Sequence, residues 1–220
     1  MMKLQKQFVH IPHQFKPIES VEDENGRRYL CEGEYYPSVT TVTGWQKRSF
    51  FAEWRKNNPA ELNRVTKRGT NLHSVIEKYL ENQDLNTKEM SADILELFLQ
   101  TKTTINQIDN IRGLECPLFS KTLKLAGRVD CVGEFNGKLS VIDFKGSTKT
   151  KREEDIENYF TQTTAYAIMW QEQFKEPIKN ICIIITCETG DVQVFERNPV
   201  HYVKQLKYAI DYYREQQNGR

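Results

Sequence analysis

The chain has 220 residues and a formal net charge of +1, with 38% hydrophobic and 11% aromatic residues. This length suits one sizeable α/β domain, and the near-neutral balance excludes a globally basic protein, so any nucleic-acid surface must be local. No stretch is apolar enough to span a membrane, and residues 1–17 lack the apolar core of a signal peptide. We therefore expect a soluble intracellular protein without a membrane partner.

The five cysteines form no metal-binding pattern. Their number is odd, no C-x-x-C pair occurs, and their spacing matches neither a zinc site nor an iron–sulfur cluster. We expect reduced thiols that act as small apolar residues, and no iron–sulfur cluster. They are Cys31, Cys116, Cys131, Cys182 and Cys187.

Residues 1–36 are expected to stand apart from a single domain that spans residues 37–220. Residues 1–17 are polar and mixed, which indicates an extended arm, and residues 27–36 suggest a small hairpin that turns near Gly33. Residues 37–42 follow and are rich in hydroxyl groups, which suits either a helix cap or a phosphate contact. Capping is the commoner use.

Residues 45–68 depart most from the average composition. Seven basic residues meet only two acidic ones, a net charge of +5, and four aromatic residues interleave with them. Positive charge with aromatic rings is typical of a surface that binds single-stranded nucleic acid. An amphipathic helix with its rings in the core explains the pattern equally well. On the first interpretation, the residues that contact DNA are Trp45, Lys47, Arg48, Phe50, Trp54, Arg55 and Arg68.

A helix is predicted to begin at Thr70, a plausible N-cap residue. His73 and Glu77 lie four residues apart and share one face of this helix, away from its apolar stripe. Taken alone, a histidine in this position is usually structural. The apolar stripe consists of Leu72, Val75, Ile76, Tyr79 and Leu80.

Residues 91–111 are predicted to form a second helix, because apolar residues recur at helical spacing. Residues 113–119 then suggest a strand. Glu115 is close to Pro117, which suits a charge on an edge strand.

Asn136-Gly137 is the strongest hairpin signal in the chain, because both central positions of a type I′ turn need a positive φ angle. A two-residue turn would place Asp130 directly opposite Asp143, and Arg128 opposite Lys145. Opposed side chains leave the sheet on one face, with Cβ atoms about 4.5–5.5 Å apart.

Two carboxylates held this close repel each other, and a divalent cation between them reverses that interaction. Asp143 and Lys145 should share one face of their strand, with Ile142 and Phe144 on the other. A lone Asp would be read as an exposed polar residue. Asp130, Asp143 and Lys145 together favour a metal site.

A basic loop with Ser147 and Lys149 follows the hairpin, and a helix is predicted from about residue 154 to residue 174. Gln162 and Tyr166 are four residues apart and share a face of that helix.

The remaining elements complete the predicted sheet. Residues 181–186 are continuously apolar, as in a central strand buried on both faces, and residues 192–195 form the next strand. A last helix should start at Asn198, with Pro199 in its first position.

Four short motifs now carry a resemblance. Gly127-x-x-Asp130 followed by Asp143-Phe144-Lys145 resembles the catalytic hairpin of the PD-(D/E)xK nucleases. Gly69-Thr70-x-x-His73-x-x-x-Glu77 and Gln162-x-x-x-Tyr166 resemble motifs of the RecB-like branch, in the same order. The arrangement is most similar to the mitochondrial genome maintenance exonucleases and their phage-encoded relatives, over roughly residues 37–166.

This resemblance implies an α/β fold: a restriction-endonuclease-like core with a mixed central sheet flanked by helices. Residues from about 38 to 68 would add a basic helical lid. It also implies the cytoplasm of a bacterial or phage-infected cell.

The resemblance further implies a Mg²⁺ or Mn²⁺ cofactor and assigns roles to the residues that match. The implied metal ligands are His73, Asp130, Asp143 and the Phe144 backbone carbonyl, with Glu115 as a further ligand or an edge-strand charge. The catalytic set adds Lys145, Gln162 and Tyr166, and Ser147 and Lys149 join the DNA-binding residues. Two departures stand out: Asp143 replaces the Glu of many members, and Gly146 replaces a frequent Thr, which leaves the role of Ser147 open.

The function we expect is metal-dependent hydrolysis of DNA from single-stranded ends. Alternatives are an endonuclease that cuts structured or duplex DNA, and a non-catalytic DNA-binding subunit of the same fold. The paired carboxylates argue against the last, since a binding module has no use for groups that repel phosphate. Cleavage polarity, preference for DNA over RNA, and protein partners stay open.

Overall fold

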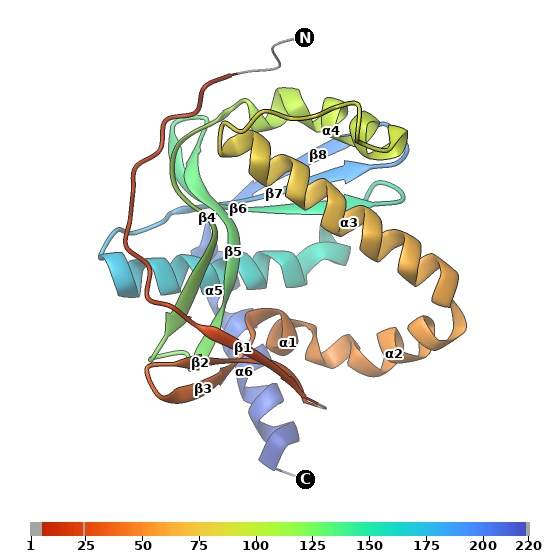
Figure 1. Cartoon of the computed structure of the whole chain (residues 1–220). Helices are drawn as coiled ribbons and strands as arrows, with labels where there is room; N and C mark the ends of the chain where they lie inside the picture. Colours follow the sequence, from red (N-terminus) through yellow and green to blue (C-terminus); the bar gives the residue numbers. More distant parts are fainter. Residues whose placement is uncertain (1–5, 24, 219–220) are drawn as a thin grey trace.

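A five-stranded mixed sheet lies at the centre of the computed structural model, which describes residues 6–23 and 25–218 (Figure 1). Strands β6 and β7 are parallel, whereas all other neighbours are antiparallel. The mixed sheet expected from the sequence is confirmed. Its order follows the chain: β4 (Ile108–Ser120), β5 (Leu125–Phe135), β6 (Lys138–Ser147), β7 (Asn180–Cys187) and β8 (Val192–Arg197).

Helices cover both faces of this sheet (Figure 1). One core lies against α1 (Val39–Gly44), α5 (Glu157–Phe174) and α6 (Val203–Asn218). The other lies against α3 (Pro59–Leu80) and α4 (Ala92–Ile105). Alternate residues of β7 enter the two cores, so the prediction of a central strand buried on both faces is confirmed.

The hairpin between β5 and β6 turns at the predicted dipeptide. Asn136 and Gly137 have φ angles of 50° and 74°, as a type I′ turn requires. The strands pair in the expected register from Phe135 opposite Lys138 as far as Cys131 opposite Ile142.

A second, three-stranded sheet consists of β1 (Glu19–Asp23), β2 (Gly26–Cys31) and β3 (Glu34–Pro37). The predicted small hairpin is confirmed: its turn has φ angles of 49° at Glu32 and 89° at Gly33. The sequence did not indicate β1. A buried cluster joins this sheet to the end of the β4–β5 hairpin: Ile18, Tyr29, Cys31, Tyr36, Phe119 and Ala126.

The N-terminal arm is extended over its described residues and runs along β4 (Figure 1). The Ile11 amide donates to the Ile111 carbonyl at 2.7 Å, and the Ile111 amide donates to the Val9 carbonyl at 2.8 Å. Phe8 is buried, and its ring packs in a T-shaped arrangement with Tyr79 of α3, with the ring centroids 5.3 Å apart. Residues 1–5 of the predicted arm lie outside the described residues.

The basic segment is divided between several helices. The Ser38 side chain accepts a hydrogen bond from the Thr41 amide and caps α1, so the capping interpretation is confirmed. A short 3₁₀ turn, Trp45–Lys47, leads into α2 (Arg48–Asn57), and α3 begins at Pro59. Proline cannot continue α2 but suits the first turn of α3. The predicted start at Thr70 is therefore wrong, because the helix begins eleven residues earlier.

The second predicted helix is too long at its C-terminal end, because α4 ends at Ile105 and β4 begins at Ile108. Ile105, Ile108 and Ile111 are three apart and all buried, which imitates a helical stripe. In β4 the same spacing arises from a register shift after Asp109 and a positive φ angle at Asn110.

Two further 3₁₀ turns precede helices: Glu153–Ile156 before α5 and Pro199–Tyr202 before α6. The Asn198 side chain accepts from the Val200 amide at 3.0 Å, so the predicted cap with proline next to it is present. None of the described helices combines the length and the apolar character that crossing a membrane requires.

Candidate active site

The site begins where β4 and β5 both change which of their side chains face each side of the sheet. On β5, Val129 enters the core beside α5, whereas Cys131 enters the core beside α3. The residue between them, Asp130, faces Glu115 of β4, because the pairs on either side keep one register. Glu115 has a φ angle of 42°, a left-handed conformation that costs a non-glycine residue about 1–2 kcal/mol. Both carboxylates therefore emerge at an irregularity of the sheet.

On the N-terminal side of Cys131, strand β5 separates from β6. The Phe144 amide donates a hydrogen bond to Asp130 Oδ2 at 2.8 Å, in place of a backbone carbonyl of β5. The predicted direct pairing of Asp130 with Asp143 is therefore wrong, as is that of Arg128 with Lys145, because the ladder between β5 and β6 ends at Cys131 and Ile142. The turn sets the register, but the strands separate before reaching these residues.

Three side chains from three elements converge at this separation. His73 of α3, Glu115 of β4 and Asp130 of β5 each offer a ligand atom, and these atoms all lie within 4.8 Å of one another. His73 Nδ1 is 3.7 Å from Asp130 Oδ2, and the imidazole stands edge-on to the Phe144 ring. One imidazole and two carboxylates are a suitable set for a divalent cation.

Asp143 lies beside this cluster, with only 2% of its surface exposed. Its Oδ1 accepts hydrogen bonds from Lys145 Nζ at 2.7 Å and from Gln162 Nε2 at 2.9 Å. Its Oδ2 also lies 2.7 Å from the ammonium, but it accepts no hydrogen bond from the described residues. The buried carboxylate is therefore already paired with one cation, the Lys145 ammonium.

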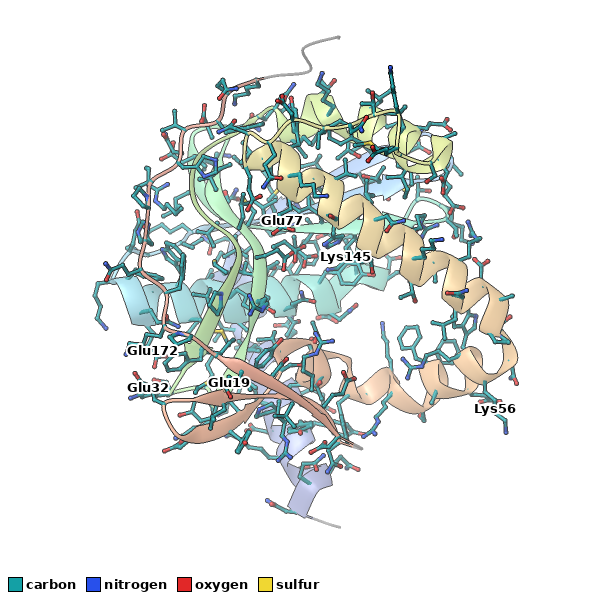
Figure 2. All side chains as sticks on the ribbon, viewed as in Figure 1. Glu19, Glu32, Lys56, Glu77, Lys145 and Glu172 are labelled. Atoms are coloured by element: carbon teal, nitrogen blue, oxygen red, sulfur yellow. The ribbon has the colours of Figure 1, made fainter. Side chains whose placement is uncertain are left out.

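The acidic groups shift each other's titration. Burial, then the carboxylates of Asp130 and Glu77, raise the pKa of Glu115 to about 7. Burial also raises the pKa of Asp143, although the Lys145 ammonium opposes this effect. Figure 2 shows Glu77 and Lys145 in the middle of the molecule, where α3 crosses the strands. A divalent cation would offset this excess of negative charge.

Helix α5 holds the hairpin in place. Gln162 is buried and bonds Asp143, while Tyr166, one turn later, is buried against Gly127. A Cβ atom on Gly127 would lie 2.5 Å from Tyr166 Oη, so the glycine of the G-x-x-D motif leaves room for this phenol. Burial raises the pKa of Tyr166 well above its ordinary value, which keeps the hydroxyl protonated.

Comparison with known proteins decides the family. The model of the PD-(D/E)XK nuclease superfamily matches residues 88–216, which include Glu115, both aspartates and α5. The chain belongs to this superfamily.

Three proteins that are similar to this chain are each named mitochondrial genome maintenance exonuclease 1. The mouse protein (Mus musculus) is 30% identical over 128 residues, and the human protein (Homo sapiens) is 31% identical over 130. Each match covers 52% of this chain and 38% of the relative. The frog protein (Xenopus tropicalis) is 28% identical over 138 residues, or 57% of this chain and 40% of the relative. The matched part thus spans about two fifths of these relatives.

The predicted DNA-binding surface of this PD-(D/E)XK protein is partly exposed and partly buried. Phe50 is 65% exposed, Lys47 and Arg55 are exposed, and Trp54 is half-buried. Trp45 differs from the expectation: it is 8% exposed and packs edge-on against Tyr213 in the core. Its ring also carries the Arg48 guanidinium at 4.3 Å, so the indole is not available for stacking on a base.

Two more predicted DNA contacts have internal partners. Arg68 is buried and forms an ion pair with Glu188, a residue that the sequence analysis did not single out. Ser147 is buried and its hydroxyl donates to the Lys149 carbonyl at 2.6 Å, so of these two residues only Lys149 is exposed.

Tyr159 is a second residue near the PD-(D/E)XK site that the sequence analysis missed. Lys145 Nζ lies over its ring at 5.3 Å. Tyr159 is three residues before Gln162, and this spacing was the available signal, because it places both on one face of α5.

We predict that Gly127→Ala lowers the free energy of unfolding by about 1–3 kcal/mol, because the new methyl group would overlap Tyr166 Oη. Urea unfolding measures this loss. Tyr166→Phe removes the nearest atom and should recover part of it in the double variant. Gly44→Ala is the matched control, since nothing lies within 4 Å of its Cβ position. Equal effects of the two alanines would contradict this account of the motif glycine.

Proposed function

We propose that the chain is a metal-dependent deoxyribonuclease that hydrolyses phosphodiester bonds from single-stranded ends. The observation that carries this proposal is the cluster of His73, Glu115 and Asp130 beside the buried Asp143–Lys145 pair. The relatives named exonuclease support the mode of action. The intact set of carboxylates and lysine argues against a subunit that only binds DNA.

The residues fit Mg²⁺ or Mn²⁺. Glu115, Asp130 and His73 would hold the ion, and the Asp143 carboxylate, which is paired with Lys145, would add a fourth donor. The Phe144 carbonyl would supply a further oxygen, because the N–H and C=O of one strand residue point to the same edge, and this N–H points to Asp130. When bound, such an ion lowers the pKa of its water and neutralises charge on a phosphate.

Lys145 is held where a positive charge is useful. Its ammonium is fixed between the Asp143 carboxylate and the Tyr159 ring, and the side chain retains 23% exposure. From this position it would orient the attacking water or stabilise the charge that develops on the phosphate. Gln162 fixes the Asp143 carboxylate, and Tyr166 supports the hairpin through Gly127.

The proposed preference for single strands rests on α2. None of its ten residues, all of them described, is buried, and Phe50 and Phe51 are 65% and 45% exposed. Helix α2 runs outward from α1, and α3 returns from its outer end across the strands (Figure 1). His73 belongs to α3. Lys56 marks the outer end of α2 in Figure 2. This arrangement would let a strand stack on exposed rings while its end reaches the carboxylates.

We predict that Asp143→Asn and Lys145→Met each lower the cleavage rate by about 10²–10³-fold, because the first removes a proposed metal ligand and the second removes the positive charge directed at the reacting phosphate. The measurement is release of labelled product from a single-stranded oligonucleotide in Mg²⁺ or Mn²⁺, with circular dichroism to confirm folding. Lys179→Met, an exposed lysine, is the control. Either variant turning over at the wild-type rate would remove these residues from the catalytic set.

His73→Ala and Glu115→Gln should raise the Mn²⁺ concentration for half-maximal activity by about 10-fold or more, because each loses a proposed ligand. Electron paramagnetic resonance of free Mn²⁺ would report the binding constant without turnover. His201→Ala, an exposed histidine, should match the wild type. An unchanged titration for His73→Ala would make His73 a structural residue.

Phe50→Ala should weaken binding of single-stranded DNA by about 1–3 kcal/mol, the range for one stacked base. Tyr208→Ala, with 61% exposure on α6, controls for a general loss of aromatic surface. The wild type should degrade linear single strands and leave circular ones intact, because a circle has no end to enter. Efficient cutting of circles would favour the alternative of an endonuclease.

A further inference from the structure

Arg68 occupies an unusual place for an arginine. It lies on α3, is 7% exposed, and covers Gly146 of β6. A Cβ atom on Gly146 would lie 3.5 Å from Arg68 Nε and 3.8 Å from Nη2. These are ordinary van der Waals distances, so the guanidinium packs against the backbone of β6 directly after Lys145.

Arg68 forms an ion pair with one carboxylate oxygen. Glu188 Oε1 accepts from Arg68 Nη1, and also from Arg64 Nη1 at 2.6 Å. The two arginines are one helical turn apart and converge on it. Arg68 Nε is buried and has no hydrogen-bond partner among the described residues. Arg64 also donates from Nε and Nη2 to Glu61, at 2.9 and 2.8 Å, so Arg68 is the member of the pair with donors left for a phosphate, which has several oxygens.

This arginine pair lies next to the proposed metal site. Arg68 is five residues before His73, roughly 7.5 Å along the helix axis. Gly146 is two residues after Phe144, whose ring His73 contacts, and two strand residues span about 7 Å. These separations run along the helix axis and along the strand, and they place Arg68 and Arg64 roughly one to three helical turns before His73. Both arginines lie between α2 and His73 along the chain.

We propose that Arg64 and Arg68 form a subsite for a backbone phosphate of the DNA strand, next to the phosphate that is cleaved, and that Glu188 occupies it in the free protein. This inference rests on the proposed function. Glu188 begins the turn between β7 and β8 and is 30% exposed, so its side chain can leave toward solvent when a phosphate takes its place.

A purely structural ion pair that ties α3 to the β7–β8 turn makes different predictions, because it affects folding but not DNA. The test is binding of a (dT)20 oligonucleotide in EDTA, where no cleavage occurs, at a series of NaCl concentrations. Arg68→Gln should weaken binding and make the slope of log K against log salt shallower by about 0.7, the value for one phosphate contact on a single strand.

Glu188→Gln should tighten binding roughly fivefold, because no carboxylate then competes with the phosphate. The double variant with Arg68→Gln should lose that gain. Glu196→Gln is the matched control, a carboxylate of the same β7–β8 hairpin with 29% exposure and a lysine partner at the opposite end. If Arg68→Gln does not fold, Arg64→Gln, at a 48% exposed side chain, should give the same change of slope.

Two results together would overturn the subsite and leave a structural ion pair. The salt slope would be unchanged for the arginine variants, and Glu188→Gln would affect binding no more than Glu196→Gln. This outcome is distinguishable from failure of the proposed function. The wild type would then cleave DNA in Mg²⁺ or Mn²⁺ while the binding data showed no subsite. Conversely, absence of cleavage would leave the binding result standing.

Discussion

The hydrogen bond from the Phe144 amide to the Asp130 carboxylate is the interaction on which the site depends. In a regular antiparallel ladder this amide would bond a carbonyl of β5. Because a side chain takes that bond, β5 separates from β6 while the amide stays satisfied. The gap between the two strands is where His73 and Glu115 meet Asp130. A local exchange of one hydrogen-bond acceptor thus brings these three side chains together inside a sheet.

The electrostatics of this gap are unfavourable in the protein alone. Asp130, Glu115 and Asp143 share the region with the Lys145 ammonium, and burial weakens their solvation. The elevated pKa of Glu115 expresses that cost. The sheet still forms because apolar cores on both faces, with β7 between them, stabilise it independently of the site. The fold therefore supports an arrangement of charges that would not assemble by itself.

The sequence predicted the parts of the site that local chemistry fixes. Asn136-Gly137 sets the hairpin register, and helical spacing places Gln162 and Tyr166 on one face of α5. It did not predict where β5 leaves β6, because Asp130 lies in the same alternation as a regular strand residue. Glu115 could be named only through resemblance, since its φ angle is a property of the folded sheet. The burial of Trp45 and the partner of Arg68 depend on α6 and the β7–β8 turn, far away in the chain.

The arm along β4 also affects how the protein avoids self-association. An uncovered outer strand presents unpaired amides and carbonyls to any other extended chain. Here Ile111 is paired on that side by Val9 and Ile11 of its own chain. Because this contact joins residues about one hundred positions apart, it closes a long loop and forms only after β4 is in place. Until it forms, and in any product that has lost residues 6–11, the edge of β4 is a template for intermolecular strand pairing.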